Sequence, residues 1–256
     1  MTQIVANAMH NTAGNEALRL ELSTIASLVN YHAWIYREIQ PFLGDQLTEI
    51  GGGFGTFSDL LIRHHILGRP NRTIEILEPD EDLFMQLRNK CQAQHTGLIQ
   101  TDRLRLTNSV FTSQVNTFDT AIMINVLEHI ENDRDIISNI YSSIQPGGTL
   151  AVFSPGLPFL YSPLDRRLGH FRRYRKDELA AIIEGAGFSL EKVQYMDILG
   201  VLPWYLINVL AGSCTFNPLL VKTYDRVVVP ITRWMEHYFG APIGKNVLVV
   251  GRKILH

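Results

Sequence analysis

The sequence lacks the features that hold together small secreted domains and zinc modules. It has only two cysteines, Cys91 and Cys214, which lie far apart and form no Cys-x-x-Cys pair. This excludes a disulfide framework and a thiolate zinc site, and it suits free thiols in a reducing compartment. The first residues, Met1 to Gly14, contain no basic segment followed by an apolar core, so we expect no secretory signal. We therefore expect a cytoplasmic protein.

Long apolar runs and an excess of positive charge are also missing. The most apolar window, Ile198–Ala211, is too short to cross a membrane and contains Pro203 and Asn208, so we expect no transmembrane segment. The chain has 23 Lys and Arg against 25 Asp and Glu, a formal net charge of −2. This balance excludes a generally basic protein that binds nucleic acid without sequence preference. We expect a small-molecule partner and no nucleic acid.

What the sequence does contain is enough apolar material for one large core. It has 256 residues, of which 46% are hydrophobic. From residue 46 onward, short β-rich runs alternate with helical patterns, which favours an α/β fold around a parallel sheet. The predicted strands are Leu47–Ile50, Thr73–Leu77, Arg103–Thr107, Phe118–Ile124 and Thr149–Phe153. The predicted helices between them are Thr56–Leu67, Asp80–Gln94 and Asn132–Ile144.

The two ends of the chain differ from this alternating pattern. Residues 1–45 read as an N-terminal helical cap, with an apolar face formed by Leu18, Leu22, Ile25, Leu28 and Val29. The main domain spans 46–256. Near its end, a helix over Lys176–Ala186 precedes two closing strands, Phe188–Ile198 and Asn246–Ile254, with an apolar, partly helical insertion at about 199–240 between them.

A glycine-rich loop, Glu49–Gly55, lies directly after the first predicted strand and before a helix. Glycines let the main chain approach a cofactor, and the helix that follows offers free N–H groups. Glu78 ends the second strand, where a carboxylate can accept both hydroxyls of a ribose. The dinucleotide pattern Gly-x-Gly-x-x-Gly is absent, because the sixth position counted from Gly51 is Thr56. A pyrophosphate, and with it a nicotinamide dinucleotide, is therefore not the favoured ligand.

Five segments together resemble the motifs of class I S-adenosylmethionine (SAM)-dependent methyltransferases, in their order and spacing. They are Glu49–Gly55, Ile76–Asp80, Phe118–Ala121, Asn125–Ile130 and Gln145–Leu150. The resemblance covers about residues 45 to 190. It implies a Rossmann-like sheet with helices on both faces, SAM as the cofactor and methyl transfer as the reaction.

The same resemblance implies which residues bind SAM. Glu49 and the loop would surround the methionine part, Glu78 would hold the ribose, and Asn125 would lie beside the methionine part. Asn108 and Ser109 occupy the place where the family usually has an acidic residue facing the adenine amine. The implied cofactor residues are Glu49, Gly51, Gly53, Gly55, Glu78, Pro79, Asn108, Ser109 and Asn125.

Methyl transfer is an in-line displacement, so the protein mainly aligns the two reactants and removes a proton from the acceptor. A neutral histidine suits a hydroxyl acceptor. His129 follows the fourth strand, at the carboxyl edge of the sheet where ligands bind, although Glu128-His129 could equally shape the turn there. Ubiquinone-type O-methyltransferases carry a similar Leu-Glu-His sequence with an added acidic residue and can use a divalent metal. Here Asn125 stands in that place, so we expect no metal.

A basic and aromatic stretch, Ser162–Lys176, follows the fifth strand. Six Lys or Arg and no acidic residue lie between Arg166 and Lys176. Its core resembles a bacterial subgroup of these methyltransferases, often associated with natural products or glycans. We predict His170 as a second candidate base, and we predict that substrate is oriented by Arg172, Arg173 and Tyr174. The alternative is a solvated loop.

The N-terminal stretch around Tyr31 and Trp34 could close over the acceptor as a lid, or it could be part of the core.

The leading hypothesis is a SAM-dependent methyltransferase that acts on a hydroxyl, less readily an amine or carboxylate, of a small and possibly anionic molecule in natural-product biosynthesis. One alternative moves this chemistry to a lipid-linked or glycan acceptor at a membrane surface, through the apolar segment Ile198–Leu220. The other is a SAM-binding module without turnover.

Overall fold

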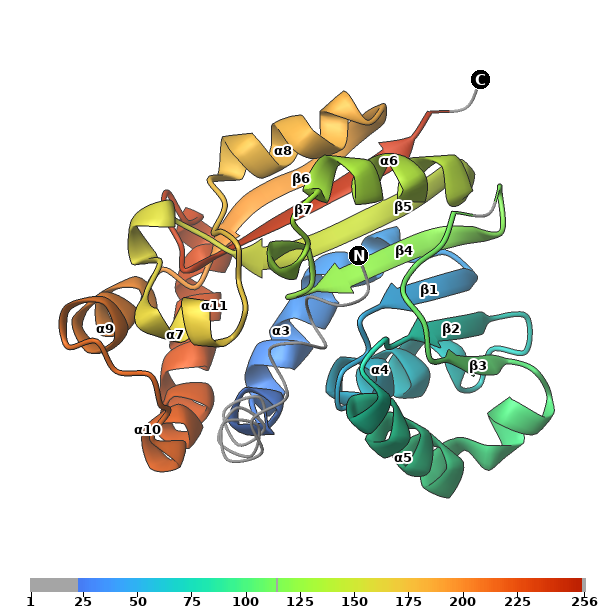
Figure 1. Ribbon diagram of the computed structural model, residues 1–256, viewed down its shortest axis with the longest axis horizontal. Helices are drawn as coiled ribbons and strands as arrows, with labels where there is room; N and C mark the ends of the chain where they lie inside the picture. Colours follow the sequence, from blue (N-terminus) through green and yellow to red (C-terminus); the bar gives the residue numbers. More distant parts are fainter. Residues whose placement is uncertain (1–22, 114, 255–256) are drawn as a thin grey trace.

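The fold is built on one seven-stranded sheet. The computed structural model describes residues 23–113 and 115–254. The strands follow the order β3-β2-β1-β4-β5-β7-β6 (Figure 1). Their bounds are β1 Gln46–Ile50, β2 Thr73–Leu77, β3 Leu104–Thr107, β4 Phe118–Ile124, β5 Ile144–Pro155, β6 Phe188–Met196 and β7 Asn246–Lys253. The first five strands are parallel, and β7 runs antiparallel to β5 and β6.

The predicted strands are confirmed, and two of them, Thr73–Leu77 and Phe118–Ile124, match residue for residue. The largest difference is at β5, which begins at Ile144 rather than at Thr149. Ile144 pairs with Phe118, and the register then shifts before Thr120 pairs with Thr149. Pro146, Gly147 and Gly148 therefore lie in an irregular part of one extended strand and do not separate it from the helix before it.

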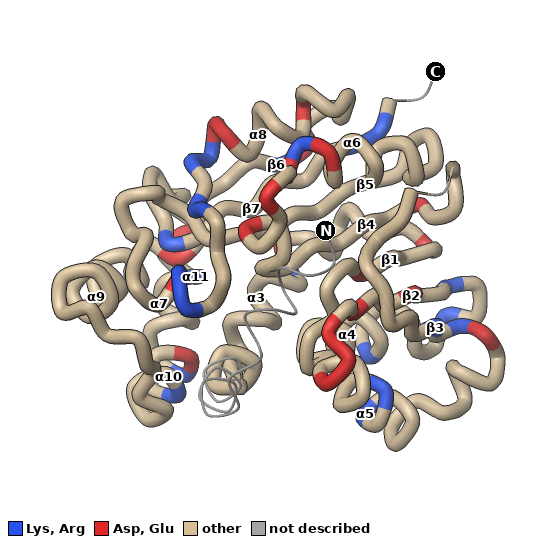
Figure 2. The backbone as a smooth tube through the Cα atoms, in the orientation of Figure 1, with Lys and Arg blue, Asp and Glu red and all other residues tan. Residues whose placement is uncertain are grey.

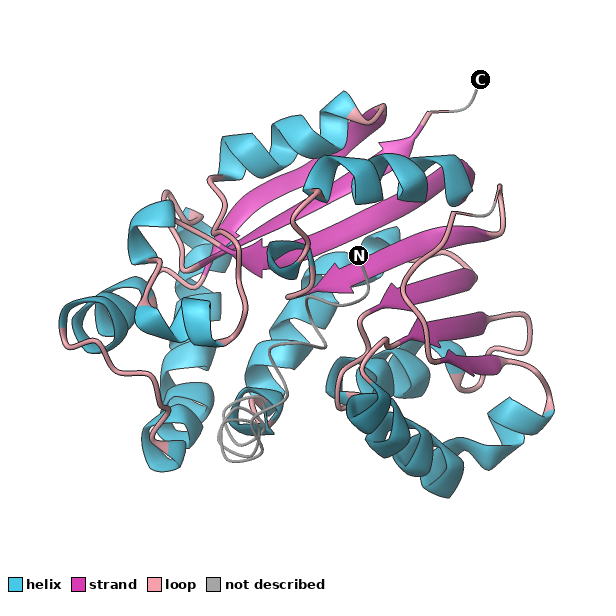
Figure 3. Cartoon of the chain, in the orientation of Figure 1, coloured by secondary structure: helices cyan, strands magenta, loops and turns pink. Residues whose placement is uncertain are grey.

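Helices cover both faces of the sheet, as predicted (Figure 3). They are α3 Val29–Ile39, α4 Thr56–Leu61, α5 Glu81–Gln100, α6 Asp133–Ser143 and α8 Lys176–Gly185. One apolar cluster unites α3, α4 and α5 with the sheet through residues such as Trp34, Leu61 and Leu87. The other unites α6 and α8 with the sheet through residues such as Ile140 and Ile183. This three-layer packing, with the sheet between two layers of helices, is the Rossmann-like architecture that the alternating pattern predicts.

Two predicted helices have different ends in the structure. The helix predicted over Thr56–Leu67 stops at Leu61 and continues as a π-helical segment over Ile62–Ile66. Helix α5 extends beyond the predicted Gln94, with a kink at His95, where φ is −134°. The His95 Nε2 atom lies 3.1 Å from Asp59 Oδ1 on α4, so a tertiary contact fixes the kink.

The N-terminal helix α3 is part of the core. Tyr31 and Trp34 are 6% and 2% exposed, and the Tyr31 ring lies edge-on to Phe153 of β5, with 6.2 Å between the centroids. The helix therefore packs as a structural layer through the two residues that the sequence offered as lid residues. Val29, predicted on the apolar face of the cap, is instead 66% exposed, because it begins the helix on the side away from the core. Leu18 and Leu22 of the same predicted face lie outside the described residues.

The predicted helical insertion lies between β6 and β7. It contains α9 Val201–Trp204, α10 Pro218–Thr223 and α11 Val229–Phe239, with π-helical segments over Tyr205–Leu210 and Tyr224–Val228. These helices gather beyond the carboxyl ends of the parallel strands, beside α7 Pro163–Arg167 (Figure 1). Within the described ranges, no helix combines the length and apolarity needed to cross a bilayer.

Replacing Trp34 with alanine tests whether α3 is core or lid. Because the side chain is 2% exposed, we expect Trp34→Ala to lower the free energy of unfolding by about 3–5 kcal/mol in denaturant titration. Val29→Ala on the same helix is the control, because Val29 is 66% exposed and its truncation leaves stability nearly unchanged. Equal, small effects of the two substitutions would contradict the core assignment.

Candidate active site

The glycine loop at the end of β1 is held by hydrogen bonds to the neighbouring strand β2. The backbone N–H groups of Gly51 and Gly52 donate to Leu77 O at 2.8 and 3.0 Å, which fixes the loop on β2. Gly53 has φ +53°, and a Cβ built on it would meet no described atom within 4 Å. The Gly53 backbone therefore borders free space that a ligand could approach, in a conformation that favours glycine.

Glu49 is a buried carboxyl group with an unsatisfied oxygen. Its side chain is 2% exposed, and its Oε2 atom has no hydrogen-bond partner among the described residues. Burial raises the pKa of Glu49 to about 8, and the charge of Glu78 adds to this effect. A cationic group placed beside the loop would satisfy this oxygen and favour its ionised form. The ammonium group of the methionine part of SAM has that chemistry.

The other predicted cofactor residues follow the ends of neighbouring strands. The Glu78 carboxylate accepts the N–H groups of Gly53 and Asp80 at 2.7 and 2.9 Å. Asn108, after β3, donates from Nδ2 to Glu78 O at 2.9 Å, which ties that loop to β2. Asn125 ends β4 with φ +54°. Because the four strands are adjacent and parallel, the predicted set, with Pro79 and Ser109, lies along one edge of the sheet.

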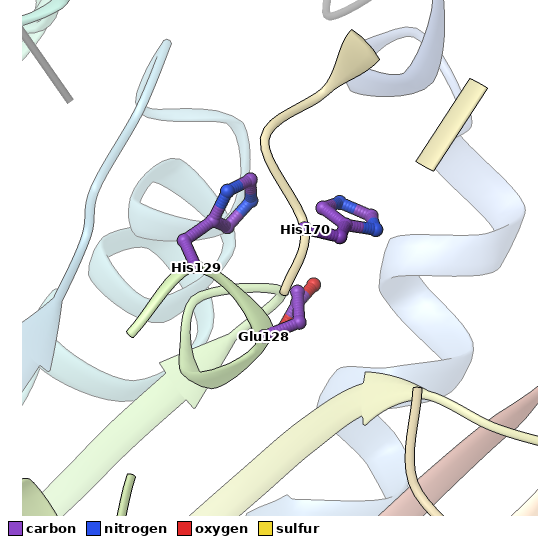
Figure 4. A group of neighbouring side chains, drawn as sticks. All are labelled: Glu128, His129 and His170. Carbon is purple, nitrogen blue, oxygen red and sulfur yellow. The ribbon is translucent and has the colours of Figure 1, made fainter. Parts of the chain in front are cut away.

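The two predicted base candidates are neighbours. His129 lies in a 3₁₀ turn after β4, Leu127–His129, and His170 lies in the loop after α7. Their ring centroids are 4.7 Å apart and the ring planes are nearly perpendicular, at 85° (Figure 4). A backbone hydrogen bond of 2.8 Å from Phe171 N–H to Glu128 O joins the two segments. The fold therefore brings together residues that are 41 positions apart in the sequence.

Asp165, which the sequence analysis did not single out, orients His170. Its Oδ1 atom lies 2.9 Å from His170 Nδ1 and accepts the Nε–H of Arg173, also at 2.9 Å. Its Oδ2 atom accepts the N–H and hydroxyl of Ser162 at 2.9 and 2.7 Å. Burial raises the pKa of Asp165, but the hydrogen bond from His170 and the charge of Arg173 outweigh it and leave that pKa below its ordinary value.

The consequence of this contact is a fixed tautomer. An ionised carboxylate only accepts hydrogen bonds, so in the neutral form of His170 the ring proton is at Nδ1 and the Nε2 atom carries the lone pair. The signal that could have found Asp165 is the Ser-x-x-Asp spacing of Ser162 and Asp165. The two residues form a capping box at the start of α7.

His129 and Glu128 complete the cluster. Burial lowers the pKa of His129 to about 3, with the charge of His170 as the second cause, so His129 is neutral near pH 7. Glu128 is 0% exposed; its Oε2 atom accepts the Ser154 hydroxyl at 3.1 Å, and its Oε1 atom has no partner among the described residues. Burial raises the pKa of the Glu128 carboxyl.

The cluster also has the composition of a metal site. Glu128, His129 and His170 each offer one ligand atom, and these atoms lie within 4.8 Å of one another. Two imidazoles and a carboxylate form a ligand set found in catalytic zinc sites. The sequence predicts no metal because Asn125 stands where a related family has an acidic residue. The fold instead brings His170, from a distant segment, beside Glu128 and His129 as a third possible ligand.

Two of the six cations between Arg166 and Lys176 form ion pairs within the protein. Arg172 donates to Asp133 Oδ2 and to Glu131 O, both at 2.7 Å, and the Tyr174 hydroxyl donates to the same Asp133 oxygen at 3.0 Å. Arg173 is 5% exposed, and its guanidinium carbon lies 4.5 Å from the ring centroid of Trp204 in the insertion. The predicted substrate-orienting residues thus bind other parts of the chain.

Comparisons with known proteins agree with this geometry. Residues 48–150 match the family model of a methyltransferase domain. A SAM-dependent methyltransferase from Archaeoglobus fulgidus shares the fold, with TM-score 0.57, 16% identity and coverage of 89% of this chain and 95% of that one. A SAM-dependent methyltransferase from Mesorhizobium loti has TM-score 0.54, 12% identity and coverage of 86% and 97%. No curated protein compared with the chain matches it.

Two further structures widen the comparison. Phosphoethanolamine N-methyltransferase 2 of Haemonchus contortus, in complex with SAM, has TM-score 0.58, 12% identity and coverage of 88% of this chain and 52% of that one. The [4+2]-cyclase SpnF also has TM-score 0.58, with 15% identity and coverage of 89% and 82%. The second structure shows that this fold also supports a different reaction, so the reaction has to be argued from the site.

The buried carboxyl group of Glu49 predicts a pH-dependent difference in stability. Because its folded-state pKa is raised from 4.5 to about 8, the folded state holds this proton more tightly, and stability falls as pH rises through that range. Glu49→Gln has no such proton to lose. The test measures the melting temperatures of both proteins without ligand. We expect the difference, variant minus wild type, to increase as the pH is raised from 5 to 8.5. A constant difference across this range would contradict the assignment.

Proposed function

We propose that this chain, whose residues 48–150 match a methyltransferase domain, is a SAM-dependent methyltransferase that methylates a hydroxyl group of a small-molecule acceptor with His170 as the base. The observation that carries the proposal is the contact of 2.9 Å between His170 Nδ1 and the buried carboxylate of Asp165. This contact leaves Nε2 free to accept a proton at the carboxyl edge of the sheet. When bound, SAM supplies an electrophilic methyl group.

The chain's own part in the reaction is to hold the acceptor and take its proton. With SAM bound, the acceptor oxygen would form its bond to the methyl group as the methyl–sulfur bond breaks, leaving S-adenosylhomocysteine. The acceptor proton would pass to His170 Nε2. Asp165 stabilises the resulting imidazolium, and Ser162 and Arg173 hold Asp165 in place. Arg173 therefore acts through Asp165 and does not bind the substrate. Thus the positioning residues lie in one connected network.

His129 has a different part in the proposal. Its ring is 4.7 Å from that of His170, and its lowered pKa keeps it neutral. Two adjacent imidazolium ions would repel each other, so a neutral His129 makes it easier for His170 to become charged. We propose that His129 orients the acceptor hydroxyl, while His170 acts as the base.

On the cofactor side, we propose that Glu49 pairs with the ammonium group of SAM, since its buried Oε2 atom lacks a partner among the described residues. The open space at Gly53 would take the cofactor, with Gly51 and Gly55 shaping the loop. Glu78 would bind the ribose. The remaining residues of the proposed cofactor set are Pro79, Asn108, Ser109 and Asn125.

The acceptor is proposed as a small molecule irrespective of its charge. The ion pair of Arg172 with Asp133 and that of Arg173 with Asp165 weaken the argument for an anionic substrate. Tyr31 and Trp34 are buried, which favours a role in the core over one in substrate binding.

A metal-assisted version of the same reaction is the second candidate. It is favoured by the unpartnered Oε1 atom of Glu128, a fully buried group beside two histidines. A divalent ion held by Glu128, His129 and His170 would bind the acceptor oxygen and promote its deprotonation. In this version His170 is a ligand and not the base.

Thermal stabilisation tests the cofactor assignment. At a hundredfold excess over its dissociation constant, SAM should stabilise the protein by about 2.7 kcal/mol, whereas NAD should not stabilise it. Gly53→Val should abolish the shift, because its side chain would enter the free space beside the loop. Gly68→Val is the matched control, since Gly68 also has positive φ, +74°, and open space but lies outside the site. An unchanged SAM shift in Gly53→Val would contradict the proposed cradle.

Substitutions at His170 and Asp165 test the proposed base. With an acceptor found by screening phenols, sugars and amines, we expect His170→Gln to lower kcat by roughly 10²–10⁴-fold. We expect Asp165→Asn to lower kcat less, and in both variants the KM for SAM should stay within about twofold, because neither residue is in the proposed cofactor set. Single-turnover assays measure the chemical step.

The outcomes separate the alternatives. Full activity in His170→Gln would overturn the base assignment. Loss of wild-type activity on treatment with a chelator, restored by added zinc or magnesium, would favour the metal-assisted version. SAM binding without turnover of any acceptor would favour a binding module.

A further inference from the structure

The insertion between β6 and β7, residues 198–244, has an unusually apolar surface. Twelve of the twenty exposed large apolar side chains among the described residues belong to it. They include Leu202, Leu210, Leu219 and Leu220, which are 59–72% exposed. Such a concentration on one segment marks an interaction surface, because single exposed apolar residues are normally scattered.

The acidic residues of the insertion are held within the protein. No charged residue occurs from Ile198 to Val221. Asp225 is 5% exposed and accepts the backbone N–H groups of Asn30 and Tyr31 on α3, at 3.1 and 2.9 Å. The Glu236 carboxyl accepts the N–H of Ile198 at 2.7 Å. Both acidic groups of the insertion are therefore used in internal hydrogen bonds.

Two of the three Lys and Arg residues of the insertion are exposed, and the third, Arg233, is partly buried. Lys222 and Arg226 are exposed one helical turn apart, on α10 and the π-helical segment that follows it. Neither forms a salt bridge within the part of the chain that the structure describes. Leu219 and Leu220 precede them directly, so long apolar side chains and free cations share one short helical stretch. Figure 2 marks Lys and Arg positions in blue at α10, with an acidic position in red beside them.

Aromatic residues complete the surface. Trp234, Tyr238 and Phe239 on α11 are 60%, 65% and 78% exposed. Tryptophan and tyrosine favour the boundary between lipid headgroups and acyl chains, and lysine and arginine extend toward anionic headgroups from the same depth. Exposed leucines, outward cations and inward acids together match an anionic lipid surface better than a neutral protein partner.

We propose that residues 198–244 dock this protein on the anionic surface of a lipid bilayer, lying in the headgroup plane without crossing the membrane. The surface also adjoins the active site. Trp204 of α9 contacts Arg173 and donates its indole N–H to Leu160 O at 3.0 Å. Phe159, which is 58% exposed, lies with its ring centroid 6.4 Å from that of Tyr205. Docking would thus place the carboxyl edge of the sheet near the membrane, where an amphipathic hydroxyl acceptor accumulates.

Docking itself does not depend on the proposed reaction; only the access of such an acceptor rests on it. The test is co-sedimentation of the full chain with vesicles of equal parts phosphatidylglycerol and phosphatidylcholine, and with vesicles of phosphatidylcholine alone. We expect at least tenfold tighter binding to the anionic vesicles, with a loss of binding as salt is raised. A blue shift of tryptophan fluorescence should accompany binding.

Two double variants locate the surface. We expect Lys222→Glu/Arg226→Glu and Leu219→Ser/Leu220→Ser each to weaken vesicle binding at least tenfold. The controls are Arg88→Glu/Arg134→Glu, which makes the same charge change at exposed positions elsewhere, and Leu67→Ser/Met85→Ser, which removes exposed apolar residues outside the insertion. Thermal melting and the SAM-induced shift of each variant show that it is folded and that the cofactor site is intact.

Three results would overturn the docking proposal. One is a wild-type protein that does not sediment with anionic vesicles. Another is equal weakening by the control variants. The third is a stable dimer, seen by light scattering, that the Leu219→Ser/Leu220→Ser variant dissociates, because it would assign the surface to a second copy of the chain. Failure of methyl transfer with intact vesicle binding would instead contradict the proposed function and leave the docking proposal standing.

Discussion

The buried carboxylate of Asp165 organises the carboxyl edge of the sheet. Four hydrogen bonds converge on it, from the backbone and hydroxyl of Ser162, from His170 and from Arg173. A buried charge is costly unless it is paired and its remaining acceptor sites are filled, and this arrangement meets both conditions. These hydrogen bonds hold the loop after α7 in a conformation in which the His170 ring contacts His129 in the turn after β4.

The same carboxylate links the site to the insertion. Arg173 pairs with Asp165 on one side and stacks against Trp204 on the other, so the end of α9 is fixed relative to His170. Lys245, at the end of the insertion, pairs with Asp197 at 2.8 Å and lies 5.7 Å from the same Trp204 ring. Movement of the insertion against a membrane would therefore act on the residues that hold the proposed base.

Local patterns predicted much of this architecture. Strands such as Phe118–Ile124 and the glycine loop Glu49–Gly55 are contiguous, and their periodicity or composition is visible in one short window. The same holds for the edge at which ligands bind, because parallel topology places it after the strands. Both histidines were identified on this basis, and the fold brings them into contact.

What the sequence could not show depends on long-range pairing. Between Arg166 and Lys176 the charge is entirely positive, which suggests a site for anions. Its partners, Asp133 and Asp165, lie outside that window, and only the fold shows that they neutralise Arg172 and Arg173. Burial of Trp34 likewise depends on where α3 docks, which helical periodicity does not encode.

A crystal structure with S-adenosylhomocysteine bound tests the central claim most directly. We predict that the His170 Nε2 atom faces the side of the S-adenosylhomocysteine sulfur that carries the methyl group in SAM. Between them there should be room for one acceptor oxygen within hydrogen-bond distance of Nε2, roughly 2.6–3.2 Å. A structure in which neither His170 nor His129 faces that space, with protein atoms sealing it from both rings, would contradict the account.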